Sequence, residues 1–143
     1  MRDLRTFFAQ NMKPMEKAQY PATARLIDPE TNEPALWEIT PISADENIAI
    51  RRTCLKLRQV PGKKGQFTQD FDANAYLVKM AVRCTSFPNL NDKELQDSYG
   101  VMDAEQLLGR MLSPAELEDY ANEVLRVNGF NETEEELREE AKN

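Results

Sequence analysis

Residues 91–130 carry the start signals of three successive short helices, and this feature constrains the fold more than any other. Asp92, Asp103 and Ser113 each stand where an N-cap is needed, because their side-chain oxygens can accept hydrogen bonds from backbone N–H groups that lack a partner inside the helix. Gly129 follows the last helix and can adopt the left-handed conformation that ends it. No catalytic pattern interrupts the three helices, so the segment is typical of a binding protein.

The apolar residues of the last two predicted helices recur at helical spacing and form one stripe on each. These residues are Ala104, Leu107, Leu108 and Met111, followed by Leu117, Tyr120, Ala121, Val124 and Leu125. Burial in a core and docking of a partner require the same spacing. Burial is the commoner explanation, and the sequence leaves both open.

The length and composition predict one domain that needs no disulfide. A chain of 143 residues can bury a substantial core. Cys54 and Cys84 lie in apolar helical patterns and form no CxxC pair, which predicts buried thiols in a reducing compartment. No stretch approaches the roughly 20 apolar residues that cross a bilayer, and the N-terminus does not resemble a signal peptide. We therefore expect a soluble protein without membrane contact in the cytoplasm.

Histidine is absent from the chain, which removes the commonest general base and the commonest metal ligand. The carboxylates cluster in helix first turns and in the C-terminal run, where capping and solvation explain them. Residues 61–65, Pro-Gly-Lys-Lys-Gly, lack the spacing of a phosphate-binding loop and are interpreted as a turn between two helices. We expect no enzyme activity, no catalytic residue, no metal site and no cofactor.

The N-terminal part predicts a β-hairpin, with strands over residues 20–27 and 36–42 that flank a turn-rich segment. A hairpin alone is marginal in water and needs helices on its apolar face. The expected fold is α+β and mostly helical, with this hairpin, at about residues 20–42, packed against a bundle of about five short helices from residue 43 onward. Residues 1–130 form the predicted domain. Residues 131–143 form an acidic tail, expected to be a frayed helix or disordered because like charges repel.

The first of these helices is predicted to start at Ser43, with Glu46 completing its cap, and to continue through Arg58. It has two apolar stripes. Burial on both sides and a face reserved for a partner both fit this pattern, with burial favoured. The next predicted helix starts at Asp72, forms the core, and stops at Pro88. The candidate partner-binding residues are Ile50, Arg51, Leu57, Arg58, Lys63 and Lys64.

Charge divides the chain into a basic and an acidic part. Residues 1–90 hold 13 basic and 10 acidic side chains, whereas residues 91–143 hold 5 basic and 15 acidic ones. Residues 51–65 hold six basic and no acidic side chain, but the whole chain is acidic and lacks interleaved aromatic residues there, which argues against nucleic acid. We expect this basic segment to pair with the acidic residues 132–140, within one chain or between subunits.

Several ordered motifs resemble the XkdN-like family of phage tail assembly chaperones. The C-terminal ones are Leu95-Gln96-Asp97-Ser98-Tyr99-Gly100-Val101, Ala104-Glu105-Gln106-Leu107-Leu108, Met111-Leu112-Ser113-Pro114 and Val127-Asn128-Gly129-Phe130. Two further segments, residues 42–47 and 71–76, where helices are predicted to begin, are also similar to the family. The resemblance covers roughly residues 4–130 and rests on the order and spacing of the motifs together.

The resemblance implies a non-enzymatic assembly helper of phages or prophages of Gram-positive bacteria, which acts in the host cytoplasm and is absent from the mature virion. Its implied client is the tape measure protein, a long helical chain whose exposed apolar faces would aggregate before the tail tube polymerises around it. The tail tube protein and a longer, frameshifted form of the chain itself are further implied partners, and a homo-oligomer is a further hypothesis. On that basis the Lys142-Asn143 end predicts the short form.

Two alternatives remain at this point. The chain could be a structural tail or ring-forming subunit without chaperone activity. It could also be a small regulatory protein that uses the basic segment at residues 51–64 to contact nucleic acid. A gene position between the tail tube gene and a very long tape measure gene would favour the chaperone over the structural subunit.

Overall fold

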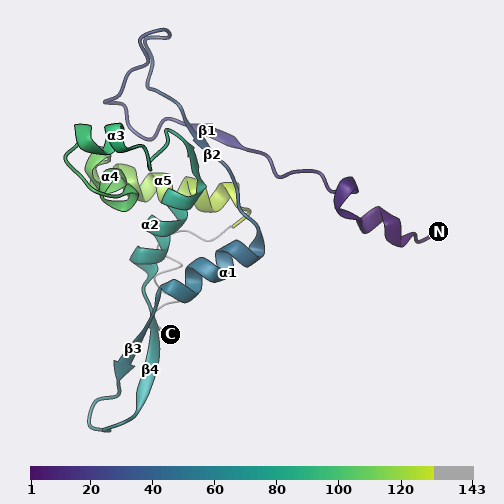
Figure 1. The fold of residues 1–143 in the computed structure, drawn as a ribbon, viewed down its shortest axis with the longest axis vertical. Helices are drawn as coiled ribbons and strands as arrows, with labels where there is room; N and C mark the ends of the chain where they lie inside the picture. Colours follow the sequence, from purple (N-terminus) through teal and green to yellow (C-terminus); the bar gives the residue numbers. More distant parts are fainter. Residues whose placement is uncertain (131–143) are drawn as a thin grey trace.

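The computed structural model describes residues 1–130 and shows an α+β fold, as predicted (Figure 1). Its core is formed by α2 (Ala73–Cys84), α4 (Ala104–Met111) and α5 (Pro114–Val127), together with a three-stranded antiparallel sheet. The predicted tail, residues 131–143, lies outside the described residues.

The sheet has the order β1-β2-β5, with β1 at Ala18–Tyr20, β2 at Trp37–Ile39 and β5 at Thr85–Phe87. The antiparallel pairing of β1 and β2 confirms a hairpin, but the predicted first strand at residues 20–27 is wrong. Pro21 follows β1 directly and cannot donate a ladder hydrogen bond, so the strand ends at Tyr20. The third strand, β5, was not predicted.

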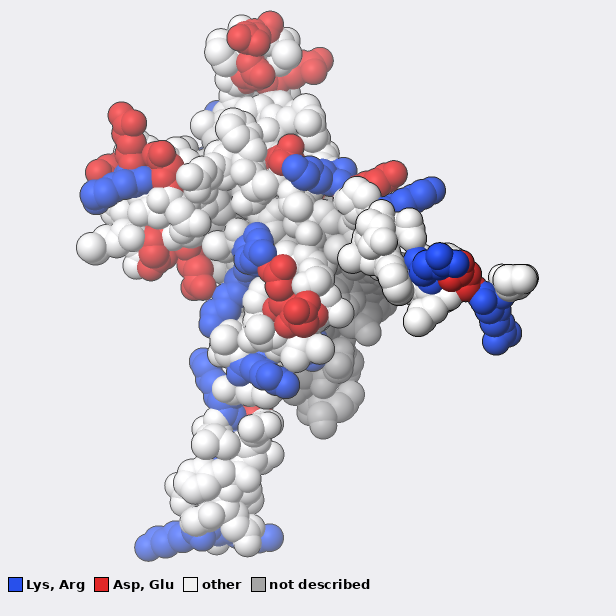
Figure 2. Space-filling model, turned by 45° about the vertical axis from the view of Figure 1, so that its right-hand side comes forward, with Lys and Arg blue, Asp and Glu red and all other residues white. Residues whose placement is uncertain are grey.

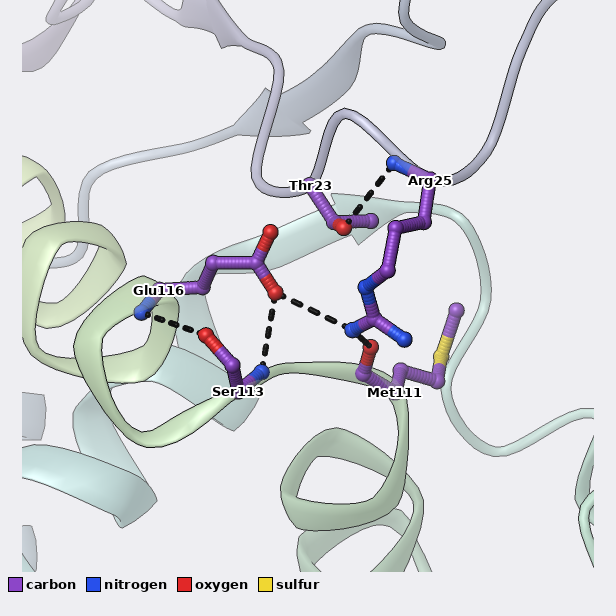
Figure 3. Close-up of polar contacts among 5 residues, drawn as sticks. All are labelled: Thr23, Arg25, Met111, Ser113 and Glu116. Atoms are coloured by element: carbon purple, nitrogen blue, oxygen red, sulfur yellow. Dashed lines mark hydrogen bonds and ion pairs between the residues drawn. The ribbon is translucent and has the colours of Figure 1, made fainter.

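Residues 21–27 instead cross the α4–α5 junction (Figure 3). Arg25 donates to the carbonyl oxygen of Met111 at 2.7 Å and to the Glu116 carboxylate at 3.0 Å. The same carboxylate accepts from the backbone N–H of Ser113, whose hydroxyl in turn accepts from the backbone N–H of Glu116. Three hydrogen bonds, from Ser113, Thr23 and Arg25, lower the pKa of Glu116 to about 2. Capping of α5 and attachment of the N-terminal segment thus share one carboxylate.

The three capped helices of the C-terminal part are confirmed. Asp92 caps the short helix α3 (Lys93–Ser98), Asp103 caps α4, and Ser113 forms a capping box with Glu116 at the start of α5. Gly129, with φ of 90°, ends α5, and Phe130 N–H donates to the carbonyl of Leu125. The predicted stripes of α4 and α5 lie in the core, with Leu117 only partly buried.

Helix α2 is the core helix that the sequence predicts, with Asp72 as its N-cap. It packs against α5 and α4. In the same core, Trp37 of β2 and Tyr120 of α5 meet edge to face with ring centres 5.3 Å apart. The helix ends at Cys84 rather than at Pro88, because the chain joins the sheet as β5. Cys54 and Cys84 are buried free thiols, as expected.

The predicted helix over residues 43–58 is wrong after Thr53. Helix α1 spans Ala44–Thr53, after which β3 (Leu55–Gln59) pairs antiparallel with β4 (Phe67–Phe71) as a second hairpin. The alternation Leu-Lys-Leu-Arg suits a strand, and the intervening glycines, Gly62 and Gly65, take positive φ in the turn. Residues 61–65 therefore form a turn between strands, not between helices.

Two further expectations for α1 are also wrong. Ser43 occupies the N-cap position, but its hydroxyl contacts the carboxylates of Asp45 and Glu46 and no backbone N–H. No residue of α1 is fully buried, and Ile48 is half exposed. Burial on both sides, the favoured explanation of its two stripes, therefore does not hold.

Candidate partner-binding hairpin

The β3–β4 hairpin presents a face with apolar side chains that is exposed along most of its length, within the described residues. Its register places Leu55 opposite Phe71, Leu57 opposite Gln69 and Gln59 opposite Phe67, so these six side chains share one face. Leu57 is 72% exposed and Phe67 is 59% exposed. Apolar side chains in such an arrangement favour contact with a partner.

The hairpin projects beyond α1, away from the sheet and the helices of the core (Figure 1). Every residue of β3 is exposed, and in β4 only Phe71, next to the body, is partly buried. A two-stranded ribbon without a packed face is marginally stable in water. A partner that covers the apolar face would therefore also stabilise the ribbon.

The base of the hairpin is attached to the body by several specific contacts. The guanidinium of Arg51 lies over the ring of Phe71, with the guanidinium carbon 4.4 Å from the ring centre. Asp72 N–H donates to the carbonyl of Cys54 at 2.8 Å, and the Asp72 carboxylate pairs with Lys56 at 3.1 Å. Hydrogen bonds from the Ala75 N–H and from Lys56 lower the pKa of Asp72. These contacts fix the direction in which the hairpin leaves the body.

A hollow of about 320 Å³ lies where the hairpin meets α1. Apolar groups and the two arginines of α1 surround it, and its lining residues are Ile48, Arg51, Arg52, Leu55 and Phe71. It is continuous with the apolar face through Leu55 and Phe71. The hairpin face and this hollow together could hold an apolar segment with acidic flanks.

The charges around the hairpin are mostly positive. Figure 2 shows basic side chains at the far end of the projection and again around its base. Lys63 and Lys64 lie in the exposed turn, whereas Arg58 pairs with Asp70 at 2.6 Å on the face opposite the apolar one. The apolar face of the hairpin thus lies between Lys63 and Lys64 at the turn and the arginines of α1 at the base.

The structure brings most of the predicted partner-binding residues together. Leu57, Arg58, Lys63 and Lys64 lie on the hairpin, and Arg51 lies at its base. Ile50 does not join them, because it lines a different hollow beside Lys79 and Arg83. The sequence interpretation placed Leu57 and Arg58 on a helix, whereas both lie in strand β3. Their role in binding a partner stays a prediction.

Four residues of this surface were missed: Ile48, Leu55, Phe67 and Phe71. The signal that could have found three of them is the period of two of a strand. Leu55 and Leu57 alternate with basic residues, the two glycines of the turn follow, and Phe67 and Phe71 then lie four residues apart with three polar residues between them. Ile48 lies in α1 and carries no such signal.

Within residues 1–130, no helix is long and apolar enough to cross a membrane. The same part of the chain contains no group of three histidine, cysteine, aspartate or glutamate side chains placed to hold a metal ion. The acidic residues 132–140, the expected partners of the basic segment, lie outside the described residues.

Comparison with known proteins agrees with this small α+β fold. The profile of the phage XkdN-like tail assembly chaperone proteins matches residues 4–142. The chain therefore belongs to the XkdN-like family of phage tail assembly chaperones. The family consists of phage assembly proteins and is not known as a family of enzymes.

Two relatives from Bacillus subtilis (strain 168) match over nearly their whole length. The phage-like element PBSX protein XkdN is 27% identical over 142 residues, which cover 99% of this chain and 94% of that protein. The uncharacterized protein YqbN is 27% identical over 143 residues, 99% of this chain and 93% of its own. A crystal structure of the protein YqbN has the same fold, with a TM-score of 0.72, 22% identity, and coverage of 92% of this chain and 99% of that one.

Proposed function

We propose that this tail assembly chaperone binds the tape measure protein in the host cytoplasm and keeps it soluble until the tail tube polymerises around it. Membership of the family supports the assembly role. The uncovered apolar face of the β3–β4 hairpin supports the binding of an aggregation-prone client, because covering exposed apolar surface is what such a client requires.

The client segment that fits this surface is an amphipathic helix. An apolar stripe on such a helix can lie along the face formed by Leu57 and Phe67 and enter the hollow beside Ile48. Acidic residues flanking the stripe would meet Arg52 at the base and Lys63 at the tip. The tail tube protein and a longer form of this chain are further proposed partners in the same assembly, and release before completion would leave the chaperone outside the virion.

Co-expression of the full chain with the tape measure protein of the same phage or prophage tests this function. The tape measure protein is expected to move from the insoluble to the soluble fraction and to co-purify with the chain. A tape measure protein that is equally soluble with and without the chain, and that never co-purifies, would instead favour a structural tail or ring-forming subunit.

A further inference from the structure

The N-terminal arm, residues 1–17, is a second apolar element without a covering surface. It contains two short 3-10 turns, Leu4–Phe7 and Ala9–Asn11, and every one of its residues is exposed. Local hydrogen bonds shape it, since Asp3 accepts from the Arg5 N–H and Asn11 donates to the Arg5 carbonyl. The exposed large apolar residues of the arm are Met1, Leu4, Phe7, Phe8, Met12 and Met15.

An arm of this composition needs an apolar surface to rest on. Phe7 is 81% exposed, and residues three apart in a 3-10 turn lie on one side, so Leu4 and Phe7 form a single apolar edge. Figure 1 shows the arm running away from the body, on the side opposite α3 and α4. In this conformation the arm is therefore presented to another molecule.

A groove between the β1–β2 loop, β5 and α3 has the complementary chemistry. It has a volume of about 360 Å³, with Trp37 and Met111 as buried lining residues and Ile27, Leu36 and Phe87 as exposed ones. This volume lies within the range of about 300–1,000 Å³ that pockets for small ligands use. The groove is separate from the hairpin and from the hollow at its base.

The charges of the two elements are opposite. The arm carries Arg2, Arg5, Lys13 and Lys17 against Asp3 and Glu16, so its side chains are net positive. The loop between β1 and β2, which forms one wall of the groove, carries Asp28, Glu30 and Glu33 and no basic residue from position 26 to position 36. Opposite charge steers association and disfavours wrong partners.

We propose that the N-terminal arm of one copy docks in this groove of a second copy, with the edge formed by Leu4 and Phe7 in the groove and the basic residues of the arm beside the acidic loop. Each copy offers both an arm and a groove, so the contact joins different surfaces and builds a ring or a chain of copies. Such an arrangement leaves the β3–β4 hairpin of every copy exposed. The inference does not depend on the identity of the client.

Sedimentation equilibrium of the full chain tests the proposal with two variants at exposed positions. Phe7→Asp/Phe8→Asp alters the arm, and Leu36→Asp alters the groove. The wild type is expected to associate as its concentration rises, and each variant to associate about a hundredfold more weakly, because each places an unpaired carboxylate in an apolar contact. Met102→Asp, at an exposed residue outside both the groove and the hairpin, is the matched control and should associate as the wild type does.

Mixing the two variants gives the sharpest result. The arm variant keeps an intact groove and the groove variant keeps an intact arm, so an equal mixture should form a dimer that does not grow further. Glu30→Lys/Glu33→Lys supplies a second groove variant, which should weaken association at low salt and less so at high salt. A monomeric wild type, including one whose arm fills its own groove, overturns the proposal, as does a mixture that stays monomeric.

Discussion

The guanidinium carbon of Arg51 lies 4.4 Å from the centre of the Phe71 ring, which joins helix α1 to the last residue of the projecting hairpin. The same guanidinium lies 5.3 Å from the ring of Tyr76, whose side chain belongs to the core. One charged group thus connects the exposed ribbon to the packed body. Of the predicted partner-binding residues, Arg51 has the clearest structural role.

Arg51→Gln should loosen the hairpin without unfolding the protein. A cation over an aromatic ring contributes about 0.5–1 kcal/mol at an accessible site, so the free energy of unfolding should fall by about that amount. Hydrogen exchange should become faster at the amides of β3 and β4, while exchange in α5 stays nearly constant. Arg52→Gln is the matched control, and equal effects of both variants would contradict the role given to Arg51.

Removing the buried hydroxyl of Tyr120 and removing that of Thr85 should have unequal costs. The two oxygens are 2.7 Å apart, and the Thr85 hydroxyl also donates to the carbonyl of Ala81 at 2.6 Å. Tyr120→Phe leaves Thr85 with that partner and should cost about 1 kcal/mol. Thr85→Val leaves the buried tyrosine hydroxyl without its acceptor and should cost more, about 1–3 kcal/mol. Urea unfolding measures both, and the reverse order would show that this hydrogen-bond direction is wrong.

Alanine substitution of the serines at the starts of α1 and α5 should change the free energy of unfolding by different amounts. Ser113→Ala removes a hydroxyl that accepts from the Glu116 N–H, so it should destabilise the protein by about 1 kcal/mol. Ser43→Ala removes a hydroxyl that contacts only carboxylates of the first turn, so its effect on the free energy of unfolding should be near zero. Equal losses in thermal or urea unfolding would contradict this difference.

Glu116 should make stability depend on pH in acid. Its pKa is about 2 in the folded protein and about 4.5 as an ordinary carboxyl, so its ionised form is favoured by folding. The stabilisation is complete above about pH 4.5 and is lost as the pH falls toward about 2. In Glu116→Gln the decline in stability over this range should be shallower than in the wild type. Glu94→Gln, which removes the same charge from the first turn of α3, controls for net charge, and an equal slope in all three proteins would contradict the role of Glu116.

The C-terminal helices could be predicted because their signals are local. Each cap lies within three residues of the N–H groups that it satisfies, as for Asp92, Asp103 and Ser113. The core helix α2 could be predicted for a similar reason, since its cap and its continuous apolar stripe lie within one short stretch. Such features depend little on the rest of the fold.

The strands were harder to predict because their pairing is not local. Strand β5 pairs with β2 although it lies more than forty residues further along the chain. It also follows helix α2 directly, without a turn signal between them. Strand β3 follows α1 after the single residue Cys54, so the apolar pattern of the sequence predicts one continuous helix through both elements. The candidate site was hard to predict for the same reason. Its basic and apolar residue types are visible in the sequence, but the face that they form depends on the pairing of Leu55 with Phe71.

Co-purification with paired substitutions tests whether the apolar face of the β3–β4 hairpin binds the tape measure protein, as proposed. Leu57→Asp/Phe67→Asp changes two exposed positions on that face, so the folded content by circular dichroism should stay as in the wild type. Met102→Asp, at a residue that is 88% exposed beside α4, is the matched control. We expect the hairpin variant to lose the tape measure protein from the soluble, co-purifying fraction while Met102→Asp retains it. Full retention by a folded Leu57→Asp/Phe67→Asp variant would contradict the account.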